Sequence, residues 1–265
     1  MNPDEKKWAL VTGGDSGIGK AVATELACKG YDLILVSKTP ARLEAAEGEL
    51  KKAFPECTVV WKSINLAASG AAEELHDWTV AEKLDVEVLV NDAGIFIFND
   101  VCDTTISRLD DILALHVRTV TMTCRLFGKD MAEKGHGFIL NLSSYSLYML
   151  WPGITVYGAT KAYIRHFSVS FSKELRENGV YVCAVAPGWI DTDLMGLSDR
   201  IRGLGRKIGI LMSPEKLARR SVRALFRGRR YVVPGWYNRA FIPLVKHLDP
   251  YTTRFVRNRT KKYQK

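Results

Sequence analysis

The chain has 265 residues, of which 47% are hydrophobic and 25% are charged, as is typical of a globular domain. This composition excludes a disordered chain, and no run approaches the ~20 consecutive apolar residues that a membrane-spanning helix needs. The five cysteines are scattered without a CxxC pair, which argues against a zinc site or a disulfide framework. With no apolar leader near Met1, we expect a cytoplasmic protein.

The formal net charge is +9, and the excess lies near the C-terminus. Between Arg219 and Lys265 there are fourteen Lys and Arg residues and a single acid, Asp249. Such a stretch can attract nucleic acid, anionic lipid or an acidic partner, or it can simply be a solvated basic tail. No nucleic-acid-binding motif accompanies the charge, so we expect no nucleic-acid partner.

The first half of the chain alternates short apolar runs with segments of helical periodicity. The predicted order is strand Trp8–Gly13, helix Gly17–Lys29, strand Tyr31–Ser37, helix Pro40–Phe54, strand Cys57–Ser63, helix Gly70–Lys83 and strand Val86–Asn91.

The same alternation continues to the end of the chain, with no linker or repeat. The predicted order is helix Ile106–Lys134, strand Gly137–Ser143, helix Thr155–Asn178, strand Val180–Ala186, helix Ser213–Arg227 and strand Tyr231–Val233. Strands this continuously apolar are buried on both faces. We therefore predict one α/β domain over residues 1–265: a Rossmann-like, doubly wound parallel sheet of about seven strands with helices on both faces.

A glycine-rich turn, TGGDSGIG (Thr12 to Gly19), joins the first strand to the first helix. Free amides and the helix dipole favour a pyrophosphate there, and glycines let it approach the backbone. The predicted phosphate-contacting residues are Gly13, Asp15, Ser16, Gly17, Ile18 and Gly19.

The end of the second strand bears on the choice of nicotinamide cofactor. An acidic residue here would bind the adenosine ribose of NAD, but the chain has Ser37 and Lys38, with Arg42 nearby. A hydroxyl and cations attract a 2′-phosphate, so we expect NADP(H) to be preferred over NAD(H). The alternative is that Lys38 is an ordinary surface lysine.

Three residues have the chemistry that carbonyl reduction requires. Tyr157 and Lys161 stand four apart in a helical segment and so share one face, where a cation can lower the pKa of a phenol. Ser144 follows the fifth strand and can orient a substrate oxygen. Tyr157 is the predicted proton donor or acceptor.

Five motifs, TGGDSGIG, VLVNDAG, LNLSS, YGATK and APGWIDTD, follow one another along the chain. In this order they resemble the short-chain dehydrogenase/reductase family. The segment from Val232 to Leu248 resembles the C-terminal end of ketoreductases of the hydroxysteroid dehydrogenase and 3-ketoacyl reductase type. The resemblance implies an NAD(P)-dependent enzyme and a homo-oligomer, a dimer or tetramer. It adds as cofactor-binding residues Tyr157, Lys161, Asn65, Leu66, Asn91, Ala93, Gly94, Pro187, Gly188, Ile190 and Thr192.

The chain departs from the family pattern at two notable positions. Asp92 replaces an Asn, and this carboxylate either lies beside the cofactor or turns inward to cap backbone amides. His116 replaces the Asn that completes the family's catalytic set. We expect His116 to hold a water or to shuttle the proton; the alternative is a packed core histidine. The other histidines lack metal-ligand spacing, and we expect no metal.

The substrate region is aromatic and apolar. The resemblance implies a lid over residues 193–212, and we expect Tyr145, Tyr148, Trp151 and Leu194 to contact a hydrophobic ketone or alcohol that is steroid-, lipid- or polycyclic-like. Ordinary core packing is the alternative for about half of these side chains.

Residues 235–265 form a basic, aromatic extension. It can lie peripherally on a membrane, pack at a subunit interface or cover its own substrate pocket.

The predicted function is NADP(H)-dependent interconversion of a carbonyl and a secondary alcohol. A catalytically reduced cofactor-binding or membrane-surface protein is one alternative; enoyl reduction or epimerisation on the same fold is another.

Overall fold

One parallel sheet forms the centre of the molecule. The computed structural model describes residues 7–192, 203 and 211–243. The strands run in the order β3-β2-β1-β4-β5-β6-β7, and every neighbouring pair is parallel. Their bounds are β1 Trp8–Thr12, β2 Asp32–Ser37, β3 Val59–Ser63, β4 Val86–Asn91, β5 Gly137–Leu142, β6 Val180–Val185 and β7 Tyr231–Val232. The predicted fold class is confirmed.

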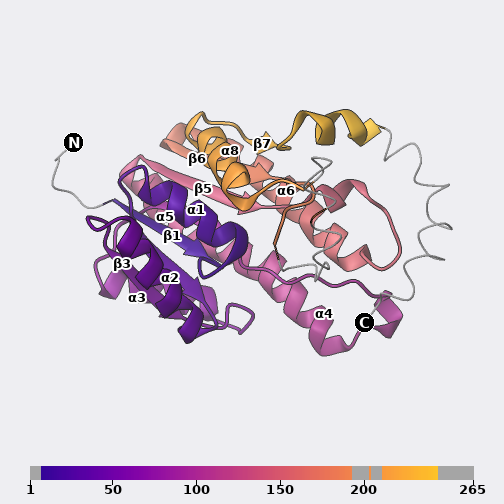
Figure 1. Ribbon diagram of the computed structural model, residues 1–265, viewed down its shortest axis with the longest axis horizontal. Coiled ribbons are helices and arrows are strands. Elements are labelled where there is room, and N and C mark those ends of the chain that lie inside the picture. The colour runs from indigo at the N-terminus through magenta and orange to yellow at the C-terminus, as the bar shows by residue number, and fades with distance from the viewer. Residues whose placement is uncertain (1–6, 193–202, 204–210, 244–265) are drawn as a thin grey trace.

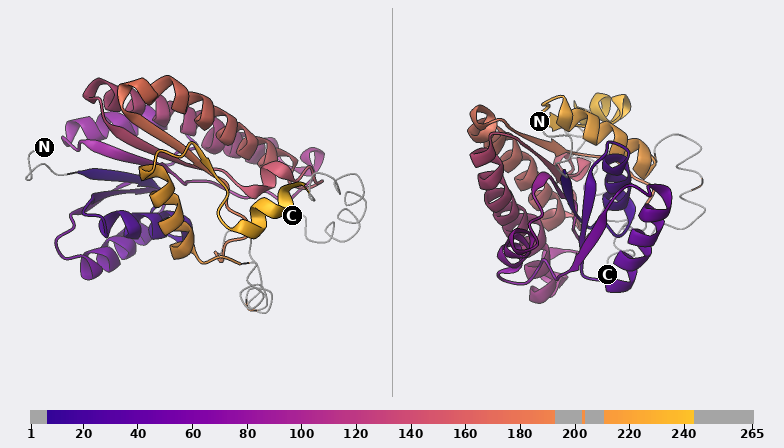
Figure 2. Two further views of the ribbon diagram at one scale, coloured as in Figure 1. Left: turned by 90° about the horizontal axis from the view of Figure 1, so that it is seen from above. Right: turned by 90° about the vertical axis from the view of Figure 1, so that its left-hand side faces the viewer.

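Helices cover both faces of this sheet, as Figures 1 and 2 show. They are α1 Gly17–Ala27, α2 Pro40–Ala53, α3 Ala71–Ala81, α4 Ile106–Leu113, α5 Val120–Lys134, α6 Thr155–Leu175 and α8 Pro214–Phe226. Short helical turns occur at η1 Val101–Asp103, η2 Ala114–Thr119, η3 Tyr145–Tyr148 and η4 Arg176–Asn178.

Alternate residues of the central strand enter opposite halves of the core. Ala9 and Val11 pack with residues of α1, α2 and α8, whereas Trp8 and Leu10 pack with residues of α3, α5 and α6. Since side chains of a strand alternate between faces, a strand covered on both sides must be apolar throughout. This double burial is why β1 is a continuous apolar run.

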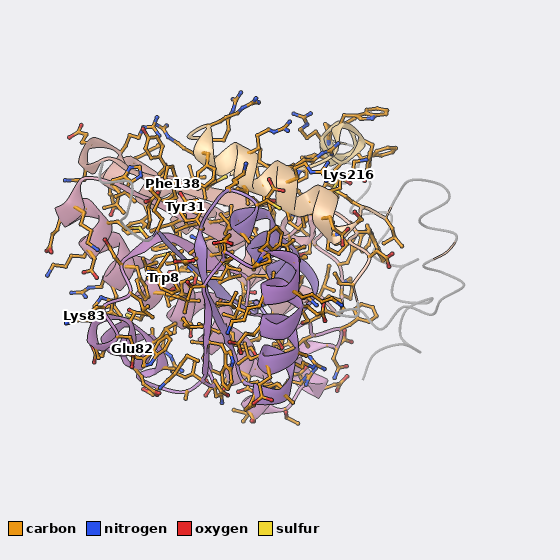
Figure 3. The ribbon with its side chains drawn as sticks, turned by 60° about the vertical axis from the view of Figure 1, so that its left-hand side comes forward. Trp8, Tyr31, Glu82, Lys83, Phe138 and Lys216 are labelled. Atoms are coloured by element: carbon orange, nitrogen blue, oxygen red, sulfur yellow. The ribbon has the colours of Figure 1, made fainter. Side chains whose placement is uncertain are left out.

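Helix α8 closes one face of the sheet against α1. Its start is marked by Pro214 and by the hydroxyl of Ser213, which accepts a hydrogen bond from the Lys216 amide at 3.3 Å. At its far end, Phe226 contacts the rings of Tyr31 and Phe138. Figure 3 shows Lys216 at one end of this helix and those two rings near the other.

The predicted helix Ile106–Lys134 is helical over its whole length, but its hydrogen-bonding pattern changes in the middle. It divides into α4 and α5 around η2, a π-helical segment that contains His116. A π-bulge adds a residue to one turn and often marks a functional site. The apolar periodicity continues across the insertion, which is why it gave no warning. In the part of the chain described, no helix is long and apolar enough to cross a membrane.

Candidate active site

The predicted site residues gather at the carboxyl ends of the strands. The chain passes from β1 to β2 on one side, and β4 pairs with β1 on the other, so the strand order reverses between β1 and β4. Ligands of doubly wound sheets bind at such a switch point. The Thr12 hydroxyl accepts hydrogen bonds from the amides of Asp92 and Ala93, both at 3.1 Å, and so joins the ends of β1 and β4.

At several positions of the glycine-rich turn, the backbone conformation or the lack of space requires glycine. Gly13 and Gly17 have φ angles of +70° and +53°, a region that favours glycine. A Cβ at Gly19 would lie 2.1 Å from the carbonyl oxygen of Gly13, so no side chain fits there. Ser16 stands at the N-cap of α1 without a side-chain capping bond. The turn therefore fits a pyrophosphate, which takes hydrogen bonds from amides at a helix start.

The loop after β6 approaches the same turn. A Cβ built on Gly17 would lie 3.6 Å from the Cγ2 of Thr192, and Ile190 forms a bridge with Met212. The carbonyl of Pro187 accepts a hydrogen bond from the Tyr145 amide at 2.8 Å. Gly188 packs against the side chain of Asn238. The predicted segment from Pro187 to Thr192 thus lies between the glycine turn and the segment after β5.

The residues predicted to bind the adenosine part of the cofactor lie at the ends of β2 and β3. Ser37 pairs with Ser63, and its hydroxyl accepts a hydrogen bond from the Thr39 amide at 3.2 Å. Lys38 and Arg42 are exposed and free to turn toward a phosphate group. Asn65 is also exposed; its side-chain oxygen accepts a bond from the Ala67 amide.

Leu66 and Asn91 are buried, and their polar contacts face away from the glycine turn. The Leu66 carbonyl accepts a hydrogen bond from the Thr119 hydroxyl at 2.6 Å. The Asn91 amide donates to Asn141 at 2.9 Å, and its oxygen accepts from Thr123 at 3.0 Å. The Asn91 side chain therefore connects β4 to β5 and α5 and has a structural role.

Tyr157 and Lys161 lie one turn apart on α6, and both are buried. The Lys161 Nζ lies 5.7 Å from the centre of the Tyr157 ring and donates a hydrogen bond to the Leu142 carbonyl at 2.9 Å. Ser144 lies near enough to the Tyr157 hydroxyl to lower its pKa. The structure thus brings together the three residues that the sequence singled out.

Burial sets the charge state of this group. It raises the pKa of Tyr157 to about 12, against a smaller lowering by the Ser144 hydrogen bond; the Asp92 carboxylate raises it further. Burial also lowers the pKa of Lys161 to about 8, and the Asp92 carboxylate partly opposes this. The expected lowering of the Tyr157 pKa is thus not found, because desolvation of the phenolate outweighs the favourable contacts.

His116 has both ring nitrogens engaged. Its Nε2 accepts a hydrogen bond from the Ile95 amide at 3.3 Å, so Nδ1 carries the proton and donates to the Thr160 hydroxyl at 2.9 Å. That hydroxyl donates to the Tyr157 carbonyl at 2.9 Å. Burial, with the nearby Lys161 cation, holds the pKa of His116 well below its usual value of 6.5. Neutral His116 therefore connects the loop after β4 to α6 through two hydrogen bonds.

The family model for short chain dehydrogenases matches residues 7–200. The chain belongs to the short-chain dehydrogenase family. Over 203 residues it is 33% identical to a very-long-chain 3-oxoacyl-CoA reductase of Rattus norvegicus, covering 73% of this chain and 62% of the relative. Over 236 residues it is 30% identical to hydroxysteroid dehydrogenase-like protein 1 of Gallus gallus, covering 87% and 68%.

A solved relative has the same fold. The short-chain dehydrogenase of Sphingobium yanoikuyae in complex with NADPH superimposes with a TM-score of 0.78 at 23% identity, covering 93% of this chain and 94% of that one. The chain spans less than two thirds of the length of the 3-oxoacyl-CoA reductase.

The sequence analysis missed part of the dehydrogenase's site. The Phe96 ring meets the Tyr157 ring edge to face at 4.9 Å, within a cluster that also holds Ile97 and Ile112. The signal was available as the apolar run Ile95-Phe96-Ile97-Phe98, directly after Gly94.

The predicted substrate residues fall into two groups. Tyr145 and Tyr148 pack with Val233, and the Tyr148 hydroxyl lies 2.8 Å from that of Tyr231. Trp151 lines a separate surface pocket together with η1 and Leu150. Leu194 and the lid residues 193–202 and 204–210 lie outside the described residues.

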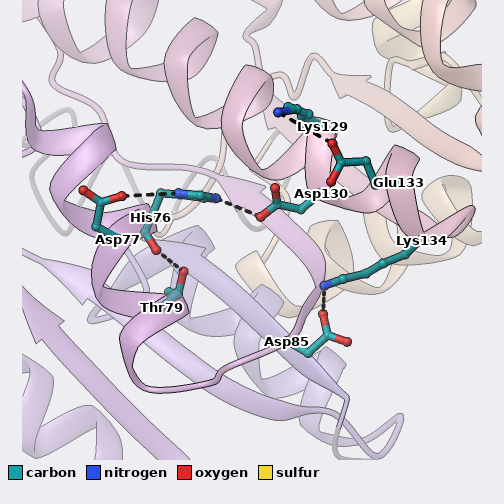
Figure 4. Close-up of polar contacts among 8 residues, drawn as sticks. All are labelled: His76, Asp77, Thr79, Asp85, Lys129, Asp130, Glu133 and Lys134. Atoms are coloured by element: carbon teal, nitrogen blue, oxygen red, sulfur yellow. Dashed lines mark hydrogen bonds and ion pairs between the residues drawn. The ribbon is translucent and has the colours of Figure 1, made fainter.

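A second polar cluster lies between α3 and α5 (Figure 4). His76 contacts Asp130 at 2.8 Å and Asp77 at 3.7 Å, and Lys134 pairs with Asp85. The His76–Asp130 contact joins α3 to α5, and the Lys134–Asp85 pair joins α5 to the segment before β4. At the surface such ion pairs contribute ~0–1 kcal/mol each. Throughout residues 7–192 and 211–243, no group of three or more potential ligands is placed to hold a metal ion.

Proposed function

We propose that this dehydrogenase interconverts a carbonyl and a secondary alcohol on a hydrophobic substrate, with Tyr157 as acid and base. The juxtaposition of Ser144, Tyr157 and Lys161 beside a phosphate-binding turn supports this proposal above all. The nicotinamide supplies the hydride when it is bound. Hydride adds to the carbonyl carbon, and the Tyr157 hydroxyl gives its proton to the oxygen, which the Ser144 hydroxyl orients.

The charge states favour reduction at neutral pH. With a pKa of about 12, Tyr157 is protonated and can donate; with a pKa of about 8, Lys161 is mostly charged at pH 7. The Lys161 ammonium then stabilises the phenolate that proton donation leaves behind.

The apolar side chains around Tyr157 suit a bulky apolar substrate. Phe96 and Ile97 pack in one apolar cluster with Tyr157. The names of the relatives point to long-chain 3-oxoacyl and steroid ketones. We propose a ketone of this general kind, and we disfavour enoyl reduction and epimerisation because Ser144 and Tyr157 converge on one oxygen.

A panel of bulky ketones, incubated with NADPH and followed at the reduced-cofactor absorbance, tests the function. We expect turnover with the wild-type chain and a loss of at least ~10²-fold in Tyr157→Phe, because the phenol is the proton donor. Tyr163→Phe is the matched control, since Tyr163 lies on the same helix and bonds Thr121 instead. Turnover by Tyr157→Phe at the control's rate would refute the assignment; no turnover by the wild type would favour a cofactor-binding protein with reduced catalysis.

We further propose that NADP(H) is preferred over NAD(H). Exposed Lys38 and Arg42 follow the end of β2 and would attract a 2′-phosphate, and Ser37 offers no carboxylate to oppose it. We expect Lys38→Asp to reduce the NADPH-over-NADH preference in kcat/KM by about 10–100-fold, the effect of one or two charge-assisted hydrogen bonds. Lys129→Asp, far away on α5, should leave the preference unchanged. An unaltered ratio in Lys38→Asp would contradict the proposal.

A further inference from the structure

The carboxyl group of Asp92 stands against the glycine-rich turn. Its Oδ2 lies 2.8 Å from the position that a Cβ on Gly19 would take and 3.2 Å from that of a Cβ on Gly13. Gly19 stands in the first turn of α1, and its amide lowers the pKa of this carboxyl group. The backbone amide of Asp92 donates a hydrogen bond to the Thr12 hydroxyl at 3.1 Å, which fixes the backbone at this position. A carboxylate is thus built into the edge of the phosphate cradle.

Several titratable groups face this carboxyl group. Lys161 and Tyr157 on α6, and Asp15 in the turn, interact with it electrostatically. His116, behind Gly94, is held neutral. Burial raises the pKa of Asp92 to about 7, against a lowering by Lys161. Because the pKa of Lys161 is lowered to about 8, the two groups titrate in one range and as a coupled pair.

We propose that Asp92 is a positioning residue that holds the glycine turn through the Gly19 amide and, by its charge, sets the protonation of Lys161 and Tyr157 and the strength of cofactor binding. For its effect on Tyr157 and Lys161 the inference rests on the proposed function. Ionised Asp92 favours a charged Lys161 and a protonated Tyr157, the forms that reduction requires.

The same charge opposes the cofactor. A diphosphate held by the amides at the start of α1 would lie next to the Asp92 carboxyl group, and like charges repel. Cofactor affinity should therefore fall as Asp92 ionises. Asn at this position, as in the family motif that the segment resembles, would keep the acceptor for Gly19 but carry no charge.

Asp92→Asn separates the two roles. During ketone reduction, we expect the alkaline limb of the kcat profile to move down by about one pH unit, because loss of the negative charge lowers the pKa values of Lys161 and Tyr157. In NADPH fluorescence titrations between pH 6 and pH 9, the wild type should bind about fivefold more weakly at the alkaline end than Asp92→Asn, and equally at pH 6. Titration of the cofactor's own phosphate is common to both proteins.

Two further variants complete the test. Asp85→Asn removes a surface carboxylate and should match the wild type. Asp92→Ala lacks both the charge and the acceptor, and it should bind NADPH more weakly than Asp92→Asn at every pH. Superimposable profiles of Asp92→Asn and wild type would overturn the proposal, as would a pH-independent loss of affinity with a lowered Tm. If the wild type reduced no ketone, the proposed function would fail, yet the NADPH titration would still decide the role of Asp92.

Discussion

Burial determines what each polar side chain of the site can do. Tyr157, Lys161, Asp92 and His116 all have pKa values displaced toward the neutral form, because a charged group loses its hydration inside the protein. A strongly displaced pKa beside a cofactor cradle is typical of an active site. His116 differs from the others because its hydrogen bonds are complete without substrate.

We predict that His116 makes stability depend on pH. Its pKa is lowered in the folded state, so below pH 6.5 the unfolded chain binds more protons and folding weakens as the pH falls. The slope contributed is at most about 1.4 kcal/mol per pH unit. His116→Ala should cost about 1–3 kcal/mol at pH 7.5, since the Ile95 amide loses its acceptor, and should reduce the acid slope.

Urea unfolding at pH 7.5 and pH 5.5 measures both effects. His136→Ala, at an exposed position, is the control. If His116→Ala kept the acid slope of the wild type, another group would be responsible for it.

Some site residues could be predicted from the sequence alone, and others could not. The four-residue spacing of Tyr157 and Lys161 places them on one helical face in any α-helix, so their proximity follows from local geometry. The partners of His116 come from the loop after β4 and from α6, which only the tertiary fold brings together. The sequence left Asp92 either beside the cofactor or turned inward, and the contact of its carboxyl group with both Gly13 and Gly19 became visible only in the tertiary structure.

At the scale of elements, the turn between β1 and α1 is the most constrained part of the fold. Gly13 donates to the Val36 carbonyl at 2.7 Å, while Gly19 packs directly on Gly13. The turn is thereby locked to the end of β2 as well as to β4. A change at Gly19 should act on both folding and cofactor binding.

Gly19→Ala tests this constraint. Its Cβ would overlap the Gly13 carbonyl at 2.1 Å, and backbone must move. We expect a loss of about 1–3 kcal/mol in the free energy of unfolding, as for other overpacked sites, with NADPH binding strongly weakened. Gly48→Ala on α2 is the matched control, because a Cβ there meets nothing within 4 Å; it should stabilise the chain by about 0.5–1 kcal/mol. Equal stability and equal affinity in the two variants would show that the turn can accommodate a side chain at Gly19.

Element boundaries were predictable where burial is complete. The seven strands fall within about two residues of the apolar runs, because strands covered on both faces allow no polar interruption. The predicted helix Thr155–Asn178 ends as α6 at Leu175 and tightens into η4. The break at η2 could not be foreseen, since one added residue leaves the helical periodicity almost unchanged.

At the scale of the whole molecule, the basic C-terminal part forms an outer surface. Seven exposed Lys and Arg residues lie on α8 and the turn after it: Lys216, Arg219, Arg220, Arg223, Arg227, Arg229 and Arg230. In the helical residues 236–243, Trp236 is 76% and Phe241 is 53% exposed. We propose that this face makes peripheral contact with an anionic membrane surface, with a homo-oligomer interface as the other outcome.

Sedimentation with vesicles distinguishes these outcomes. We expect the wild type to pellet with anionic vesicles, and a Trp236→Ala/Phe241→Ala double variant to lose at least ~10-fold in affinity, because each aromatic contributes about 1.5–3 kcal/mol when buried. Val80→Ala, exposed on α3, is the control. Equal pelleting of all three would remove the membrane contact, and a change of elution volume only in the double variant would identify a subunit interface.

Deuteride transfer tests the central claim most directly. A ketone that the wild type reduces is incubated with NADPH labelled with deuterium on the transferable position of C4, and the alcohol is analysed by mass spectrometry. We expect one deuterium on the carbinol carbon with the wild type, and no labelled alcohol with Tyr157→Phe although it still binds NADPH. Unlabelled alcohol from the wild type, or labelled alcohol formed by Tyr157→Phe at the wild-type rate, would contradict this claim.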